Sequence, residues 1–380
     1  MKKFFKGLFL LIILAVVAAA FIWRGEIASI TSVKQVGDNQ YLYQMEYKAP
    51  YDLDEVIAAN IDENSKLLEY VVSKVGKGIK FKIGSSQTEG GAAAAASAEA
   101  DHCTSFQAKQ ADGDGWYYGR NYDFFKNPSL VTISRPKKGY ASIAVSDMSH
   151  FGYSLDKVPS DLKSKILCIA SIYAPVDGMN EKGLCTSIMA LPKMASQQNT
   201  GKDAVGTTII MRLFLDRCAT VQEALDLLET VDVRHDAKVG SGYHYMVADA
   251  QGNCAVIEFD KEDGWKTMIV KKPADMNYMV VTNHLLEPKY YTTTPDPAVG
   301  NPHSKSWWRY ETASAFLAER NGCVSFEEAQ QCLSDVHWKD LLWDNGMVED
   351  TQFSNVYDQK KLTLSLRNWN DYDRTETFSL

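Results

Sequence analysis

The stretch Asp101–Phe124, DHCTSFQAKQADGDGWYYGRNYDF, places a cysteine, an arginine and an aspartate around a predicted β-hairpin. Apolar and aromatic residues flank the turn ADGDGW, a pattern typical of two short strands joined by a tight turn. Because a hairpin folds its arms side by side, we expect Cys103 to lie near Arg120 and Asp123. A guanidinium stabilises a neighbouring thiolate, and a carboxylate can orient a nearby amine. The stretch therefore predicts a nucleophile with an activating group and an orienting group.

The spacing of the two charged residues restricts this arrangement. Arg120 and Asp123 are three positions apart, and side chains alternate between the two faces of a strand. They are therefore expected on different faces unless a bulge or a strand end intervenes. A solvated ion pair is the alternative interpretation of the two charges, and an unreactive strand thiol is the alternative for Cys103.

The same stretch resembles the start of the mature chain in the choloylglycine hydrolase family. These are linear-amide C–N hydrolases that include bile-salt hydrolases and penicillin V acylases. The resemblance depends on Cys-Thr-Ser-Phe at 103–106 and Gly-Arg-Asn-Tyr-Asp-Phe at 119–124, and it extends over residues 103–380. It implies an α+β fold of the N-terminal-nucleophile type, an αββα sandwich of two stacked antiparallel sheets flanked by helices. By similarity, Arg120 would contact the thiol and Asp123 the α-amine of the cysteine.

Three further motifs carry the resemblance downstream. Residues 176–184, VDGMNEKGL, are predicted to form a polar turn between apolar strands. The family has a similar string, and the resemblance implies that Asn180 lines the oxyanion hole. Asn283 ends the apolar run VVTN and matches the second oxyanion donor, a neutral group that does not compete as a base. Arg309, in SWWRY, matches a late active-site arginine. From the residues alone, the two asparagines are equally explained as turn formers and Arg309 as a solvated helix residue.

The resemblance requires Cys103 to be the first residue of the working chain. A free α-amine has a pKa of about 7.7–8.0 and can act as the base near neutral pH. That amine exists only when the bond between His102 and Cys103 has been cleaved. We therefore expect that the cleavage that matures the chain also creates the catalytic base. Few histidines have a context that suggests a Cys/His dyad, and His102 would be removed by the same cleavage.

The composition is that of a globular protein, with 380 residues of which 45% are hydrophobic and 23% charged. The net charge of −8, without a Lys/Arg stripe, argues against a nucleic-acid partner. The seven cysteines have no metal-ligand spacing, so neither a metal nor a cofactor is expected. The six cysteines other than Cys103 are predicted to be small buried hydrophobes. Disulfides stay open as an alternative because the chain is expected to be exported.

The first 24 residues combine a basic start with a long apolar run at positions 4–23, FFKGLFLLIILAVVAAAFIW. This pattern is typical of a secretory signal peptide or of a single membrane anchor. The small residues at positions 18–20 favour cleavage, whereas continuation of the run to Trp23 favours an anchor. Both alternatives place the rest of the chain outside the cytoplasm, either secreted or held at the cell membrane.

Two segments separate this leader from the predicted nucleophile. Residues 25–82 alternate strand-like pieces with a helical pattern from Asp52 to Val75, and we expect a pro-segment or accessory region. Residues 83–102 are rich in Ala, Gly and Ser and predict a flexible linker that contains the maturation site, with a helical alanine tract as the alternative. Residues 103–380 form the predicted amidohydrolase domain.

The sequence predicts an exported cysteine amidohydrolase that cleaves a linear amide bond of a small N-acyl substrate through a thioester on Cys103. One alternative is an acyltransferase that uses the same thioester, and another is a non-catalytic, membrane-tethered binding protein of the same fold. The N-terminal extension resembles the layout of acid ceramidase and N-acylethanolamine amidase, which have a cleaved pro-segment. The identity of the amide and the formation of a homo-oligomer are left open.

Overall fold

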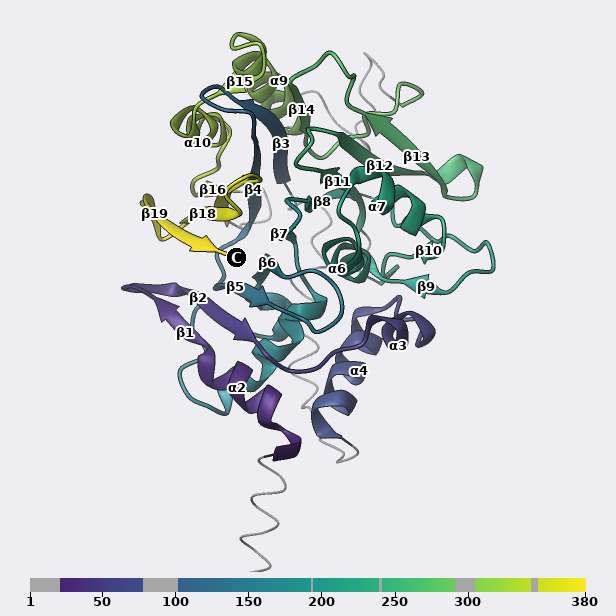
Figure 1. The fold of residues 1–380 in the computed structure, drawn as a ribbon, viewed down its shortest axis with the longest axis vertical. Helices are drawn as coiled ribbons and strands as arrows, with labels where there is room; N and C mark the ends of the chain where they lie inside the picture. Colours follow the sequence, from purple (N-terminus) through teal and green to yellow (C-terminus); the bar gives the residue numbers. More distant parts are fainter. Residues whose placement is uncertain (1–20, 78–101, 193, 239–240, 291–304, 343–347) are drawn as a thin grey trace, which may run out of the picture.

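The structure is a computed structural model of the 380-residue chain. Two stacked β-sheets form its centre, and Figure 1 shows their strands with helices on either side. The expected leader up to residue 20 and most of the expected linker lie outside the described part of the chain. The structure describes residues 21–77, 102–192, 194–238, 241–290, 305–342 and 348–380.

The first sheet has the strand order β1-β2-β5-β6-β7-β8-β11-β12-β13 within the described residues. Neighbouring strands are antiparallel except for β2 and β5, which run parallel. Strands β5, β6 and β12 are buried along their whole length, as expected for a sheet covered on both faces. The strands are β1 Lys34–Val36, β2 Asn39–Tyr47, β5 Ser129–Ser134, β6 Ser142–Asp147, β7 Asp177–Asn180, β8 Cys185–Pro192, β11 Ser241–Ala248, β12 Cys254–Asp260 and β13 Lys266–Lys271.

The second sheet contains the predicted hairpin. Its order is β14-β3-β4-β17-β18-β19, with β15 beside β3 and β16 beside β17. β3 and β4 pair antiparallel on either side of the turn ADGDGW, so the predicted hairpin is confirmed. The strands are β3 His102–Gln110, β4 Trp116–Phe125, β14 Tyr278–Val281, β15 Cys323–Val324, β16 Leu341–Leu342, β17 Val348–Asp358, β18 Thr363–Asn368 and β19 Asp371–Ser379.

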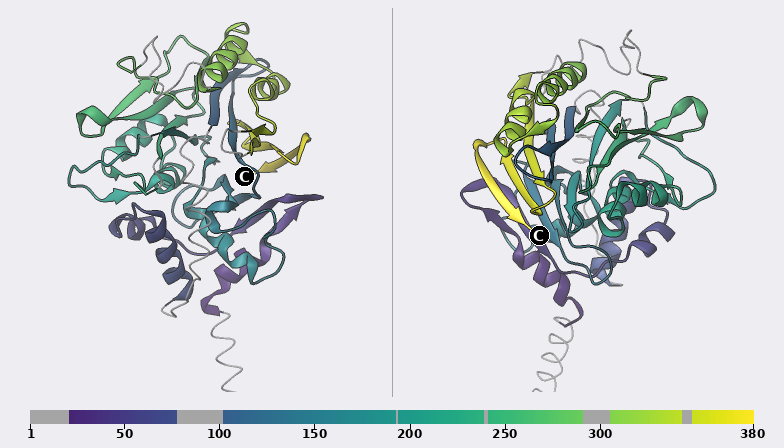
Figure 2. Two further views of the ribbon diagram at one scale, coloured as in Figure 1. Left: turned by 180° about the vertical axis from the view of Figure 1, so that it is seen from behind. Right: turned by 45° about the horizontal axis from the view of Figure 1, so that its top comes forward.

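Helices cover the outer face of each sheet, and Figure 2 shows the two helical layers on opposite sides of the strands. α9 and α10 pack on the second sheet, whereas α6, α7 and the 3₁₀ helix η2 pack on the first. α10 begins with a capping box formed by Ser325 and Glu328, and the side chain of Thr220 caps the start of α7. The predicted αββα sandwich is confirmed. The helices are η2 Ser164–Tyr173, α6 Thr207–Arg217, α7 Val221–Leu228, α9 Lys305–Ala318 and α10 Phe326–Asp335.

Residues 21–77 are built into the first sheet. β2 pairs with β5 over six residue pairs, and the helices α2 Arg24–Ser32 and α4 Asn64–Gly76 pack against η2. Leu42 of β2 is fully buried in the main hydrophobic core. The single helix expected from Asp52 to Val75 is instead two helices, α3 Leu53–Ala58 and α4. Because strand pairing and core packing hold this region, hydrolysis before Cys103 would not by itself release it.

The seven cysteines form no disulfide, and all of them belong to the described residues. Burial raises the pKa of Cys168 to about 11 and that of Cys218 to about 12. These thiols therefore stay protonated near neutral pH and pack as small hydrophobes. Within the described ranges, no helix is both long and apolar enough to cross a membrane.

Candidate active site

Cys103 is the second residue of β3, and side chains from two other elements hold its backbone. Its N–H donates to Oδ1 of Asn283 at 2.5 Å. Its carbonyl oxygen accepts a hydrogen bond from Nη1 of Arg309. Nη2 of Arg309 also donates to Oδ1 of Asn283 at 2.9 Å. The three residues form one connected cluster with only 3%, 6% and 0% exposure for Cys103, Asn283 and Arg309.

Asn283 reaches Cys103 because β14 lies beside β3. The two strands pair antiparallel with Val281 opposite Ser105, so Asn283, two residues later, comes level with Cys103. Nδ2 of Asn283 donates to the carbonyl oxygen of Ala190 at 2.9 Å, near the end of β8. The amide therefore bridges the two sheets at the predicted nucleophile. Sequence reasoning identified this residue, and the structure brings it to Cys103.

Arg309 lies near the start of α9 and is fully buried, which excludes the solvated-helix interpretation. Besides its bond to the Cys103 carbonyl, Nη1 donates to Oγ1 of Thr104 at 3.0 Å. Burial lowers the pKa of Arg309, against the opposing effect of the charges of Asp123 and Cys103. A guanidinium nevertheless stays protonated in proteins. Arg309 therefore fixes the start of β3 as a buried cation.

Arg120 and Asp123 project from opposite faces of β4, as their spacing predicted. In the register of β3 and β4, Arg120 shares the face of the Cys103 side chain. Asp123 lies on the face covered by α9, where its Oδ2 is 3.7 Å from Nη1 of Arg309. Its Oδ1 accepts a hydrogen bond from Thr351 at 2.6 Å. In the uncleaved chain the Cys103 N–H donates to Oδ1 of Asn283, and the contact of Asp123 with a free α-amine of Cys103 stays a prediction.

The guanidinium of Arg120 lies between the thiol and a buried carboxylate. Nη2 donates to the carbonyl oxygen of Ile188 at 2.6 Å, and Nε is 3.8 Å from Oδ2 of Asp177. Burial alone would lower the pKa of Arg120, but Cys103, which is also its hydrogen-bond partner, and Asp177 raise it. A positive charge is thereby fixed beside Cys103, an arrangement that stabilises a thiolate.

Asp177 is a site neighbour that the sequence reasoning did not single out. It begins β7, and its Oδ1 accepts hydrogen bonds from Nδ2 of Asn355 at 3.0 Å and from the hydroxyl of Tyr357. Burial raises the pKa of Asp177 to about 6, although Arg120 and both hydrogen bonds oppose the shift. The one feature of the sequence that could have identified Asp177 is its position in the string VDGMNEKGL, as an acidic residue at the start of a buried strand.

Asn180 does not lie at the thiol, so its predicted role in the oxyanion hole has no support in the geometry. It ends β7, and its side chain is fully buried in the turn that leads to β8. All four of its side-chain hydrogen bonds go to this turn and to the end of α6. Nδ2 donates to the carbonyl oxygens of Leu215 and Cys218, and Oδ1 accepts from the N–H groups of Lys182 and Leu184.

The separation follows from the course of β8. Asn180 is bonded to Leu184 at the start of this strand, whereas Ala190 near its far end touches Asn283. Six residues of extended strand span roughly 20 Å. The motif correctly predicted that Asn180 lies in a turn. The opposite end of β8, which carries Ala190, is the end that reaches the site.

His284 follows Asn283 but is poorly suited to act as a base. Its ring stacks on Trp307 with 4.1 Å between the ring centroids, and Nδ1 is 2.9 Å from the hydroxyl oxygen of Ser306. Burial, together with the charges of His244 and Arg309, lowers the pKa of His284 to about 3. The ring is therefore neutral near pH 7 and a weak proton acceptor.

The site contains two buried ion pairs, one on each face of β4. Arg120 faces Asp177 on the side of the first sheet, and Arg309 faces Asp123 on the side of α9. In the part of the chain that the structure describes, no group of three or more His, Cys, Asp or Glu side chains is placed to hold a metal ion. The site therefore consists of the Cys103 thiol, the guanidinium groups of Arg120 and Arg309, and the amide group of Asn283.

A sequence profile decides the family. The profile of the acyl-coenzyme A:6-aminopenicillanic acid acyl-transferase family matches residues 162–371, more than half of the chain. The chain belongs to this family. The match includes Asn283 and Arg309 and begins after the hairpin that carries Cys103. No curated protein sequence matches this family member.

Solved structures share the fold of this family member. Two variant structures of the conjugated bile acid hydrolase from Clostridium perfringens each match with a TM-score of 0.52 and 15% identity, over 73% of this chain and 92% of theirs. Penicillin V acylase from Agrobacterium tumefaciens matches with a TM-score of 0.47 and 18% identity, over 70% of this chain and 83% of that one. The fold shared with the bile acid hydrolase confirms the predicted sandwich, and the family shown by the profile agrees with the predicted resemblance.

Proposed function

We propose that the protein is a cysteine amidohydrolase that cleaves a linear C–N bond of an N-acyl amide through a thioester on Cys103. Its family supports amide hydrolysis or acyl transfer of the N-terminal-nucleophile type. The observation that carries the proposal is the convergence of Asn283, Arg309 and Arg120 on the nitrogen, the carbonyl oxygen and the thiol of Cys103. Burying charged groups costs free energy, and a purely structural cysteine requires none of them.

Activation would depend on cleavage of the bond between His102 and Cys103. The Cys103 nitrogen, which now donates to Oδ1 of Asn283, would become an α-amine in the same place. Oδ1 could accept one N–H of this amine and direct its lone pair toward the thiol proton. An α-amine with its usual pKa of about 7.7–8.0 is a suitable base near neutral pH.

The reaction then needs only groups of the site. As sulfur attacks the amide carbonyl, the thiol proton moves to the α-amine of Cys103, and the oxyanion accepts a hydrogen bond from the amide group of Asn283. The ammonium protonates the leaving amine as the C–N bond breaks, which leaves a thioester. Water attacks the thioester and gives a proton to the α-amine. Collapse of this second intermediate releases the carboxylic acid and restores the thiol.

Replacement of the nucleophile tests the proposal. Cys103→Ala should abolish hydrolysis of a panel of N-acyl amino acids and the appearance of a fragment that begins at residue 103. Cys168→Ala is the matched control, because Cys168 is a buried thiol whose pKa is raised to about 11, and it should retain both properties. Amide hydrolysis by Cys103→Ala at the wild-type rate would contradict the proposed function.

Acyl transfer is the second candidate, favoured by the description of the matched family as an acyl-transferase family. The same thioester would pass its acyl group to an amine instead of water. Product analysis with 6-aminopenicillanic acid and with simple amines separates the two reactions. An N-acyl product that increases with amine concentration at the expense of free acid would favour transfer, whereas free acid alone would favour hydrolysis.

We also propose that residues 4–23 take the chain out of the cytoplasm, as a cleaved signal peptide or as an anchor. The support is their apolar run after a basic start. Fractionation of cells that express the full chain tests this point. Recovery in the culture medium would favour a signal peptide, recovery in the membrane fraction an anchor, and recovery in the cytoplasm would contradict export.

A further inference from the structure

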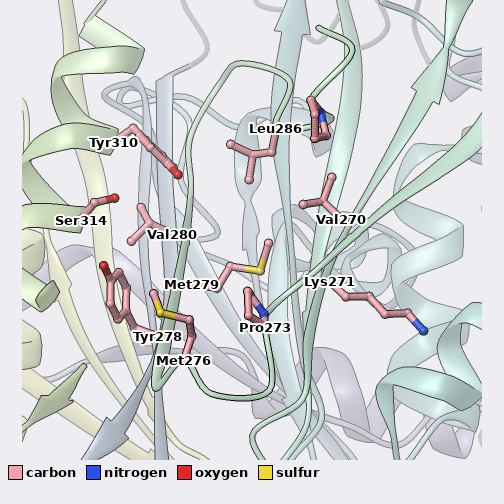
Figure 3. Close-up of a pocket in the computed structure, with 11 residues that line it drawn as sticks. Val270, Lys271, Pro273, Met276, Tyr278, Met279, Val280, Leu286, Tyr310 and Ser314 are labelled. Carbon is pink, nitrogen blue, oxygen red and sulfur yellow. The ribbon is translucent and has the colours of Figure 1, made fainter. Parts of the chain in front are cut away.

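An apolar pocket of about 460 Å³ lies between the edge strands of the two sheets, β13 and β14, beside α9. Figure 3 shows aliphatic and thioether side chains around it, with Tyr310 and Ser314 on the side of α9. The volume is within the range of roughly 300–1,000 Å³ typical of small-molecule sites. Its apolar wall includes Val270, Met276, Met279, Val280 and Leu286.

The pocket shares its supporting elements with the candidate active site. β14 contributes Met279 and Val280 to the wall and leads directly to Asn283. α9 contributes Tyr310, which follows Arg309 in the sequence. Because Asn283 and Arg309 both contact Cys103, the same strand and the same helix connect the pocket to the nucleophile.

A buried Glu–His pair holds the segment that forms the far wall. The Glu258 carboxylate accepts the N–H groups of Leu286 and Glu287 at 2.7 and 2.9 Å. Nδ1 of His244 is 3.2 Å from Glu258, and its Nε2 is 2.7 Å from the carbonyl oxygen of Thr282. Both side chains are fully buried. This connected network fixes the pocket wall and the residue before Asn283 to the same sheet.

We propose that this pocket binds the acyl chain of the amide substrate, and that the substrate class is amides with a long aliphatic acyl group. This inference rests on the proposed function. Aliphatic walls favour an alkyl chain in proportion to the apolar area that it buries. The flexible thioethers of Met276 and Met279 can adapt to chains of different length. A polar acyl group would lose hydrogen bonds with water that aliphatic walls do not replace.

A chain-length series tests the substrate class. N-acyl amino acids with acyl groups from acetyl to dodecanoyl are incubated with the processed protein. We expect kcat/KM to increase by about three- to fourfold for each added methylene until the pocket is filled. A series in which kcat/KM is constant or decreases with chain length would overturn the inference.

A substitution on α9 tests the location. Ser314 is half-buried in the pocket wall, and Ala315, the next residue, is exposed and outside the wall. Ser314→Phe should fill the pocket and lower the ratio of kcat/KM for dodecanoyl over acetyl substrates by at least tenfold. Ala315→Phe, the matched control, should leave this ratio unchanged. An equal ratio in both variants would place the acyl chain elsewhere.

Direct binding separates failure of the pocket from failure of the proposed function. Fluorescence titration of the full protein with cis-parinaric acid should give saturable binding that Ser314→Phe weakens at least tenfold and Ala315→Phe does not. This result supports the pocket whether or not an amide is hydrolysed. Binding that is absent, or equal in the two variants, would overturn the pocket. Tight binding without hydrolysis of any N-acyl amide would contradict the proposed function alone.

Discussion

Asn180 and Asn283 are both buried asparagines at the ends of strands, and the molecule uses them differently. Asn180, at the end of β7, is bonded within its own turn and to the end of α6. Asn283, after β14, is bonded to Cys103, Ala190 and Arg309, which come from three other elements. The chemical group is the same, but only Asn283 connects the two sheets at the nucleophile. An amide that satisfies its own turn is structural, whereas one that joins separate elements can serve a reaction.

The comparison predicts its largest effect for Asn283. Asn283→Ala removes the acceptor at the Cys103 nitrogen and the proposed oxyanion donor, and loss of one such donor typically lowers kcat by about 10²–10³. Steady-state kinetics on an N-acyl amide would measure it. Asn283→Asp keeps an acceptor but not the N–H donors, so it should process normally and hydrolyse slowly. A kcat of Asn283→Ala within threefold of wild type would remove Asn283 from the mechanism.

A smaller effect is expected for the arginine that holds both Cys103 and Asn283. Arg309→Lys keeps the charge but loses the planar fork, and bonds to charged groups contribute about 1.5–3 kcal/mol. We therefore expect a loss of about 10- to 100-fold in kcat. Arg212, buried on α6 and paired with Asp216, supplies the control. Arg212→Lys should lower stability without this loss, and equal kinetic losses in both variants would show a general folding effect.

Asn180→Ala should affect stability instead of catalysis. It removes four buried hydrogen bonds, each of which contributes about 1 kcal/mol, so we expect the free energy of unfolding to fall by roughly 2–4 kcal/mol. Urea denaturation measures this change, and kcat per folded molecule should stay within about twofold of wild type. A loss of more than tenfold in kcat would return Asn180 to the site.

The smallest effect concerns pH and Asp177. Its pKa in the folded protein is raised to about 6 by burial, so the folded state holds a proton that the unfolded chain has already lost above about pH 4. The free energy of unfolding contributed by this group therefore falls as pH rises from about 4 to 6. Asp177→Asn removes that contribution. Urea denaturation at pH 4, 5 and 6 should give a shallower decline for the variant, and parallel curves would contradict this assignment.

Local patterns were sufficient to predict the hairpin and the opposite faces of Arg120 and Asp123. Each of these depends on periodicity or turn chemistry within a few residues. The motifs around Cys103 and Asn283 also predicted the family and the sandwich. Local patterns could not show that Asn180 lies away from Cys103. Its position depends on which end of β8 approaches the second sheet, and the end that does so carries Ala190.

Long-range packing explains the remaining differences. Strand-like pieces were expected within residues 25–82, but no local signal indicates that β2 runs parallel to β5 and extends the first sheet. Arg309 is polar on a helix and would normally be solvated; its burial depends on Asp123 and the backbone of Cys103, which are distant in sequence. The role of Glu258 and His244 could not be predicted from the sequence either. It depends on the packing of β11 and β12 beside the segment after Asn283.

Intact mass with N-terminal sequencing of the purified full chain tests the central claim most directly. We expect a fragment that begins at Cys103 and an N-terminal fragment that stays bound to it, because β2 remains paired with β5. A chain that stays whole across pH and still hydrolyses N-acyl amides would contradict the role of the α-amine as base. A chain that stays whole and hydrolyses none of them would favour the non-catalytic binding protein.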